Sequence, residues 1–158
     1  MHKPLFVVSF YDVNSPERYI PEDEDIWNEV KHKYDCISPA EEDEWTEKHF
    51  VKALNNMFDG VVYDGNTYII PKEAIKAYLE KMTEKVKQYL DEKPLTGKNI
   101  NRWMNGLRYG IFEEGTHFIV DGSSEYGVGF ASHLLYEEEG KEKVFANIKL
   151  ESIYDAHC

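Results

Sequence analysis

The spacing of apolar residues changes several times along this chain, and each change predicts a different element. Residues 5–11 are apolar at both alternating sets of positions, which predicts a strand covered on both faces. After Pro21, a residue that suits the first position of a helix, apolar residues recur at helical spacing over about residues 21–35. The chain is therefore expected to begin with a buried strand followed by a short helix.

Two further signals come from local motifs. Ser38 and Glu41 have the spacing of a capping box, in which each side chain satisfies an unpaired backbone amide, so a helix is expected from Ser38 to about Asp59. Asp64-Gly65 lies between two short runs of β-forming residues. Because both central residues of a type I′ turn need positive φ, Asp-Gly is favoured there, and a hairpin is expected at this point.

The remainder of the chain predicts two more helices and three strands. Apolar residues at helical spacing extend over about residues 71–91 and again over 100–110. The pattern then becomes alternating, and turn-forming residues divide it into predicted strands over 116–120, 126–136 and 142–153. The helical part of this region is thus expected to be followed by a purely β part.

Together these elements predict an α+β fold for a single acidic domain, residues 1–158. Its antiparallel sheet is expected to contain the N-terminal strand, the hairpin and a C-terminal three-stranded meander, packed against about four helices. Hydrophobic residues make up 42% of the chain and aromatic residues 14%, which excludes a disordered acidic tail.

The sequence also bears on the compartment. No apolar run reaches the roughly 18 residues of a membrane span. The two cysteines, Cys36 and Cys158, do not form a disulfide framework. We therefore expect a soluble cytoplasmic protein that does not associate with membranes.

The charge of the chain is unevenly distributed. Residues 1–60 contain 14 Asp and Glu against 6 Lys and Arg, a net of −8 out of the total of −12. Residues 61–100 are close to neutral, with 6 acids against 7 bases. A negative field of this strength attracts basic protein surfaces and repels nucleic acid and anionic membranes. The expected partner is a basic protein or nucleoprotein complex, with no direct binding of nucleic acid.

The acids of the first sixty residues are gathered in two clusters, each followed closely by a tryptophan. Carboxylates beside a large aromatic ring bind arginine well, through charge-assisted hydrogen bonds, stacking and cation–π contacts. The alternative is that the tryptophans belong to the core and the acids only solubilise the surface. The predicted partner-binding residues are Glu22, Asp23, Glu24, Asp25, Trp27, Glu41, Glu42, Asp43, Glu44 and Trp45.

Common metal and cofactor motifs are absent from the sequence. There is no H-E-x-x-H, no paired C-x-x-C and no acidic loop with EF-hand spacing. A Walker loop and a G-x-G-x-x-G after a strand are also missing. We therefore expect no metal, no cofactor and no catalytic residues, and an enzyme is the less favoured class.

Two histidines keep an enzymatic alternative open. His117 and His133 lie on neighbouring predicted strands, a placement that is similar to the two-histidine phosphoesterases, whose motif is His-x-Thr or His-x-Ser. Here the third positions hold an isoleucine and a leucine, so the hydroxyl group of that motif is missing. The alternative function is a small hydrolase or phosphoesterase that uses both histidines, together with an acid such as Asp121 or Glu125.

The leading hypothesis follows from charge and size. It is a non-enzymatic acidic binding protein that inhibits a basic, nucleic-acid-handling protein. One form is a nucleic-acid mimic of the kind used in phage anti-defence, which occupies a positively charged groove. The other is an immunity protein that covers the active site of a basic toxin. Both would use complementary charge to speed and orient association. The identity of the partner and the oligomeric state stay open.

Overall fold

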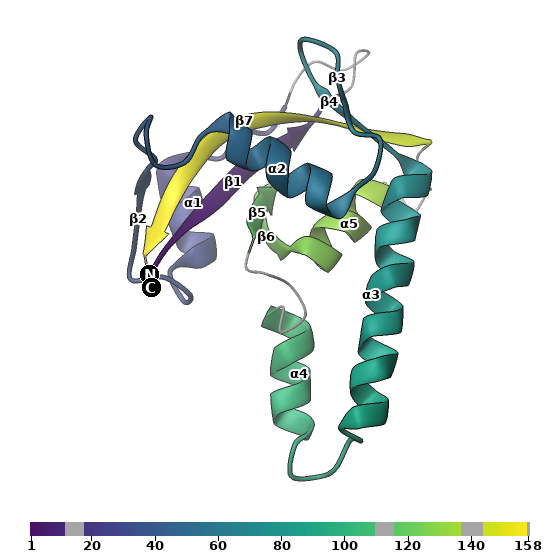
Figure 1. Ribbon diagram of the computed structural model, residues 1–158. Coiled ribbons are helices and arrows are strands. Elements are labelled where there is room, and N and C mark those ends of the chain that lie inside the picture. Colours follow the sequence, from purple (N-terminus) through teal and green to yellow (C-terminus); the bar gives the residue numbers. More distant parts are fainter. Residues whose placement is uncertain (12–17, 110–115, 137–143, 158) are drawn as a thin grey trace.

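The computed structural model describes residues 1–11, 18–136 except 110–115, and 144–157, with only the backbone of residues 105–109 (Figure 1). In this part of the chain, seven strands form one sheet in the order β3-β4-β7-β1-β5-β6, and β2 pairs with β7 outside this path. The elements are β1 (His2–Phe10), α1 (Asp23–Val30), β2 (Cys36–Pro39), α2 (Glu47–Met57), β3 (Val62–Tyr63), β4 (Tyr68–Pro71), α3 (Lys72–Glu92), α4 (Ile100–Tyr109), β5 (His117–Val120), β6 (Ser123–Tyr126), α5 (Gly127–Leu135) and β7 (Phe145–His157). The predicted α+β class with one sheet is confirmed.

The first strand lies inside the sheet, as its doubly apolar pattern predicts. β1 pairs antiparallel with β7 on one side and parallel with β5 on the other. Leu5 and Val7 point to one face, Phe6 and Val8 point to the other, and all four are buried. This strand therefore separates two hydrophobic cores.

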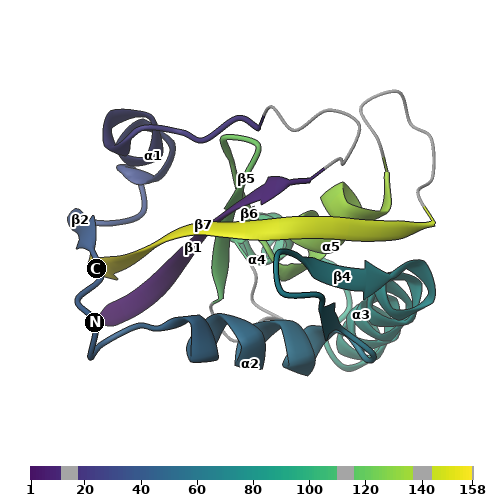
Figure 2. The ribbon, with the colours of Figure 1, turned by 90° about the horizontal axis from the view of Figure 1, so that it is seen from above.

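Helices cover both faces of the sheet. Residues of α2, α3 and α5 pack with Phe6 and Val8 in the larger core, where the rings of Phe118 and Phe130 stack with centroids 3.9 Å apart. On the other face, α1 packs over Leu5 and Val7 in the smaller core. Figure 2 shows α1 and α2 on opposite sides of the central strands.

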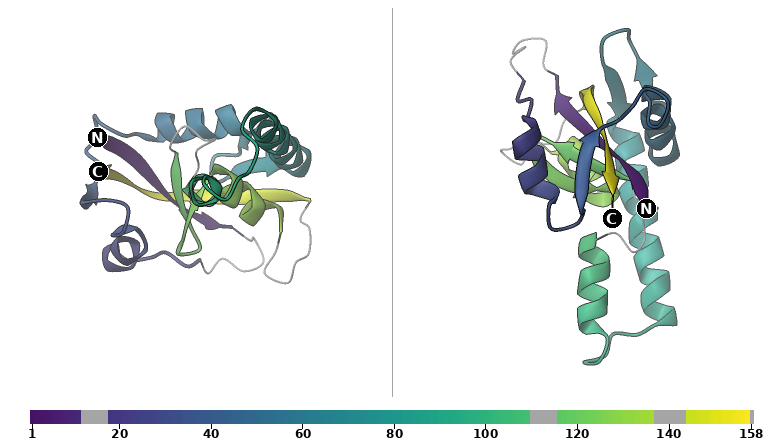
Figure 3. Two further views of the ribbon diagram at one scale, coloured as in Figure 1. Left: turned by 90° about the horizontal axis from the view of Figure 1, so that it is seen from below. Right: turned by 90° about the vertical axis from the view of Figure 1, so that its left-hand side faces the viewer.

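The helices predicted over 71–91 and 100–110 are confirmed as α3 and α4, and they form an antiparallel pair that extends away from the sheet (Figure 3). The rings of Tyr89 and Trp103 meet edge to face, with centroids 4.6 Å apart, and neither ring belongs to the two cores. In the turn between the helices, the backbone N–H of Thr96 donates to Asn99 Oδ1 at 2.8 Å. Strong helical periodicity was enough to locate both elements.

The helix start predicted at Ser38 is wrong. Residues 36–39 form β2, which pairs with residues 154–157 at the far end of the chain, so their backbone groups belong to the sheet. The helix begins only at Glu47, after Thr46, whose backbone N–H donates to His49 Nδ1 at 3.1 Å. The first helix is also shorter than predicted, over residues 23–30.

The hairpin over β3 and β4 is confirmed, but its predicted type I′ turn is wrong. Four residues, 64–67, separate the paired strands, because the Asp64 carboxylate accepts hydrogen bonds from the backbone N–H groups of Asn66 and Thr67 at 2.9 and 2.8 Å. The type I′ conformation occurs instead at Asp121-Gly122, where φ is 48° and 76° and two residues join β5 to β6.

The strand predicted over 126–136 is wrong, and the expected meander is replaced by another arrangement. After β6 the chain forms α5, which buries Phe130, Ala131, Leu134 and Leu135 in the larger core. A run this apolar fits a buried helix as well as a strand. β7 then lies on the opposite side of β1 from β5 and β6. Because α5 replaces a predicted strand, the described ranges contain five helices rather than about four.

Candidate functional site

The first acidic cluster forms the start of α1. Glu22, Asp23, Glu24 and Asp25 are all exposed, and their charges lie at the positive end of the helix dipole. Asp25 Oδ2 accepts a hydrogen bond from the backbone N–H of Glu22 at 3.2 Å. The hydroxyl of Tyr154 in β7 donates to Asp23, and burial together with this carboxylate raises the pKa of Tyr154 to about 12. The sheet therefore holds this cluster at a defined place.

The second acidic cluster lies between β2 and α2. Glu41, Glu42, Asp43 and Glu44 are exposed and belong to turns, not to the first turn of a helix as predicted. Just before them, the backbone N–H of Ala40 donates to the carbonyl oxygen of Ile153 in β7 at 2.9 Å. The cluster thus begins directly where the edge strand β2 ends.

The predicted tryptophans are half-buried and fixed to the same region. Trp27 packs against the smaller core. Trp45 Nε1 donates to Asp155 Oδ1 at 3.0 Å, and its ring meets His49 edge to face, with centroids 5.2 Å apart. Burial alone would raise the pKa of Asp155, but hydrogen bonds with His2 and Trp45 together lower it below its ordinary value. Each ring is anchored on the protein and still has exposed surface.

Three consecutive residues of β7 therefore anchor most of the predicted site. Ile153 holds the chain before the second cluster, Tyr154 holds Asp23 of the first, and Asp155 holds Trp45. Both clusters lie at the end of the sheet where the chain termini meet, the first on the α1 side and the second at the β2 edge (Figure 1). We call the eight carboxylates of residues 22–25 and 41–44 the acidic end.

The charge of the acidic end is not neutralised by the rest of the described chain. None of its eight carboxylates makes an ion pair with a lysine or arginine there. The cation–carboxylate pairs involve other acids: Arg18 with Glu151 at 2.7 Å, and Lys87 with Glu84 at 3.0 Å. The negative field of these residues is therefore directed into solvent.

The two histidines of the enzymatic alternative do not share a site. His117 in β5 is fully buried. It points to the α1 face, because alternate residues of a strand share a face and Ile119, two residues later, belongs to the smaller core. His133 belongs to α5, which covers the other face, and pairs with Glu125 at 3.2 Å between Nδ1 and Oε1. The sheet stands between the two rings, so the paired-histidine site of that alternative is not formed.

His117 instead lies in a buried polar network that the sequence did not indicate. Its Nδ1 is 2.8 Å from the Tyr34 hydroxyl and its Nε2 is 2.6 Å from Ser124 Oγ. Lys33 Nζ donates to the same Ser124 oxygen at 2.9 Å and lies 4.6 Å above the Tyr126 ring. Burial, with a smaller contribution from Lys33, lowers the pKa of His117 to about 3. The neutral ring thus links the end of α1 to the β5–β6 hairpin.

Comparison with known proteins does not assign a family to this chain. The chain matches no protein-family model, no curated protein and no solved structure. Within the described ranges, no three side chains of His, Cys, Asp or Glu are arranged to hold a metal ion. No helix there is long and apolar enough to cross a membrane. The acidic end is therefore the feature of the described residues that bears most directly on function.

Proposed function

We propose that this chain is a non-enzymatic binding protein whose acidic end docks onto a basic protein and blocks it. The observation that carries the proposal is the anchoring of both acidic clusters on residues 153–155 of one strand, with all eight carboxylates exposed. Carboxylates fixed this closely repel one another, and they are not offset by cations of the described chain. A basic partner would remove that repulsion.

The two tryptophans give the same surface a way to select arginine. A guanidinium group can form paired hydrogen bonds with a carboxylate and stack on an aromatic face at the same time. Trp27 lies two residues after Asp25, and Trp45 directly follows Glu44. Because both rings are held by the sheet, little side-chain freedom is lost when a partner binds.

The proposed partner is a protein or nucleoprotein complex that handles nucleic acid, and the proposed effect is inhibition. Rows of carboxylates present acceptor oxygens to the same lysines and arginines that bind phosphates. Under this proposal the protein acts as a nucleic-acid mimic or as an immunity protein that covers a basic active site. In either form, complementary charge speeds the encounter and makes it sensitive to salt.

Capture from a lysate of the source cells tests this function with two matched variants. E41K/E42K/E44K reverses the second cluster, and E73K/E80K/E92K makes the same change of net charge on exposed residues of α3. We expect wild type and the α3 variant to retain the same basic, nucleic-acid-handling protein at low salt, and the cluster variant to lose it. Inhibition of the captured protein by wild type, relieved by the cluster reversal, completes the test. Equal capture by all three chains would refute the proposal.

A further inference from the structure

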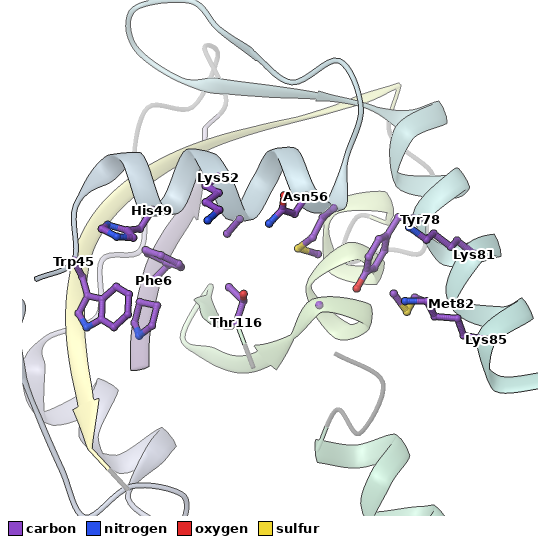
Figure 4. A pocket seen from close by; sticks show the side chains of 14 residues that line it. Phe6, Trp45, His49, Lys52, Asn56, Tyr78, Lys81, Met82, Lys85 and Thr116 are labelled. Atoms are coloured by element: carbon purple, nitrogen blue, oxygen red, sulfur yellow. The ribbon is translucent and has the colours of Figure 1, made fainter. Parts of the chain in front are cut away.

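A groove with a composition unlike the rest of the molecule lies between α2 and α3 (Figure 4). It has a volume of about 350 Å³, and β1 contributes Pro4 and Phe6 to its floor. Its apolar lining includes Phe6, Met57, Tyr78 and Met82. The groove is therefore large enough for a small organic molecule, and its lining mixes apolar with polar side chains.

Three lysines stand in the walls of this groove. Lys52 comes from α2, whereas Lys81 and Lys85 come from α3 and extend beside Tyr78 and Met82 (Figure 4). Residues three or four apart lie on the same face of a helix, so each helix presents one stripe of cationic and apolar residues to the space between them. Trp45 lies at the opposite end of the groove from the two α3 lysines.

The charge of the groove is opposite to that of the chain. The sequence has 30 acids against 18 lysines and arginines, yet no acid is among the described residues that line the groove. Lys52, Lys81 and Lys85 have no carboxylate partner in the part of the chain that the structure describes. Lys81 and Lys85 are also one turn apart, where like charges disfavour a helix. An anion beside these two lysines would relieve that repulsion.

We propose that the groove binds a small amphipathic anion, with an apolar or aromatic body along the floor and a phosphate or carboxylate head beside Lys81 and Lys85 of α3. A small ligand inside the groove experiences mainly charges within about 8 Å, the screening length at physiological salt. A long polyanion would experience the whole protein, whose net charge of −12 repels it. None of the eight carboxylates of the acidic end lines this groove, but Trp45 does, so the two proposed sites adjoin at that ring.

Backbone-amide NMR titrations at constant ionic strength test the site with two probes, adenosine monophosphate and dodecanoate. We expect at least one probe to shift amides of residues 49–57 and 78–85 selectively. A response to adenosine monophosphate alone assigns an aromatic phosphate ligand, and a response to dodecanoate alone assigns an aliphatic carboxylate. Inorganic phosphate and uncharged dodecyl maltoside, which each lack one half of the ligand, should bind about tenfold more weakly or not at all. If neither probe shifts groove amides, the proposal is overturned.

Two variants with equal loss of charge locate the binding. K52Q/K81Q/K85Q removes the groove lysines, and K48Q/K87Q/K98Q removes three exposed lysines outside it. All six positions are exposed, so both proteins should fold, which their amide spectra will verify. The groove variant should bind the active probe about tenfold more weakly, whereas the control should stay within about twofold of wild type. Equal affinity of wild type and the groove variant would also overturn the proposal.

Discussion

The buried ring of His117 should make the stability of this protein depend on pH in a way that one substitution removes. Its pKa is about 3 in the folded protein and 6.5 as a free side chain. Because the folded state disfavours the proton, the stability is complete above pH 6.5 and is lost as the pH falls toward about 3. Each unit in this interval costs about 1.4 kcal/mol, so the change from pH 7 to pH 5 should cost about 2 kcal/mol.

Urea unfolding monitored by tryptophan fluorescence measures this cost for wild type, H117Q and H32Q at pH 7 and pH 5. With a denaturant slope of about 2 kcal/mol per molar, the wild-type midpoint should fall by about 1 M. H117Q leaves the Tyr34 hydroxyl without its ring partner, so it should be about 1–3 kcal/mol less stable at pH 7. Because glutamine does not titrate, the stability of H117Q relative to wild type should rise by about 2 kcal/mol between pH 7 and pH 5.

The exposed His32 provides the matched control, since H32Q should retain the wild-type loss between the two pH values. Carboxylates that titrate in the same range contribute equally to all three proteins and cancel in the differences. If wild type and H117Q lose stability in parallel, then His117 is not neutral and buried in solution, and the reasoning fails.

Two other substitutions test the fold. Gly122 has φ of 76°, and an added Cβ would lie 2.8 Å from the Tyr19 ring, so G122A should destabilise the protein by about 1–2 kcal/mol in thermal melts. Gly97 has open space around it and serves as the control, so G97A should melt within a degree or two of wild type. F130A removes a fully buried ring of α5 that stacks on Phe118, so it should cost about 3–5 kcal/mol in urea unfolding, and a loss below about 1 kcal/mol would contradict the packing of this helix.

Sequence patterns located the elements whose signal is long or unambiguous. The doubly apolar run of β1 reflects a strand that is buried on both faces. The repeated helical spacing over α3 reflects a helix that is buried on one face. Two of the signals that failed were short motifs, and the third, the apolar run over 126–136, fits a buried helix as well as a strand. Ser38 and Glu41 could cap a helix locally, but pairing of β2 with β7, more than a hundred residues away, uses the same backbone groups. Local chemistry cannot report a competitor that distant.

The two Asp-Gly pairs show a similar dependence on context. Asp64-Gly65 and Asp121-Gly122 have the same local chemistry, yet only the second adopts the tight turn. At the first, the Asp64 carboxylate closes a wider loop by accepting two backbone N–H groups. An Asp-Gly pair therefore predicts that the chain reverses direction. The pairing register of the flanking strands determines the length of the loop and the type of turn.

The candidate site was predictable only in part. Exposure of the two acidic clusters follows from their composition, but their common anchoring depends on where β7 lies in the sheet. The groove lysines come from two helices that the sequence separates by a hairpin. A usable signal was present in α3, where Lys81 and Lys85 repeat at one-turn spacing beside apolar residues within a nearly neutral third of the chain.

An NMR titration with a nona-arginine peptide would probe the acidic end most directly. Amide shifts should concentrate at residues 22–27 and 41–45 and weaken steeply as salt is raised, because screening reduces attraction between exposed charges. The E41K/E42K/E44K variant should lose the shifts around its own cluster, while E73K/E80K/E92K should keep the wild-type pattern. Shifts spread evenly over the acidic residues of the whole protein, or centred away from residues 22–27 and 41–45, would contradict a defined cation-binding surface at this end of the sheet.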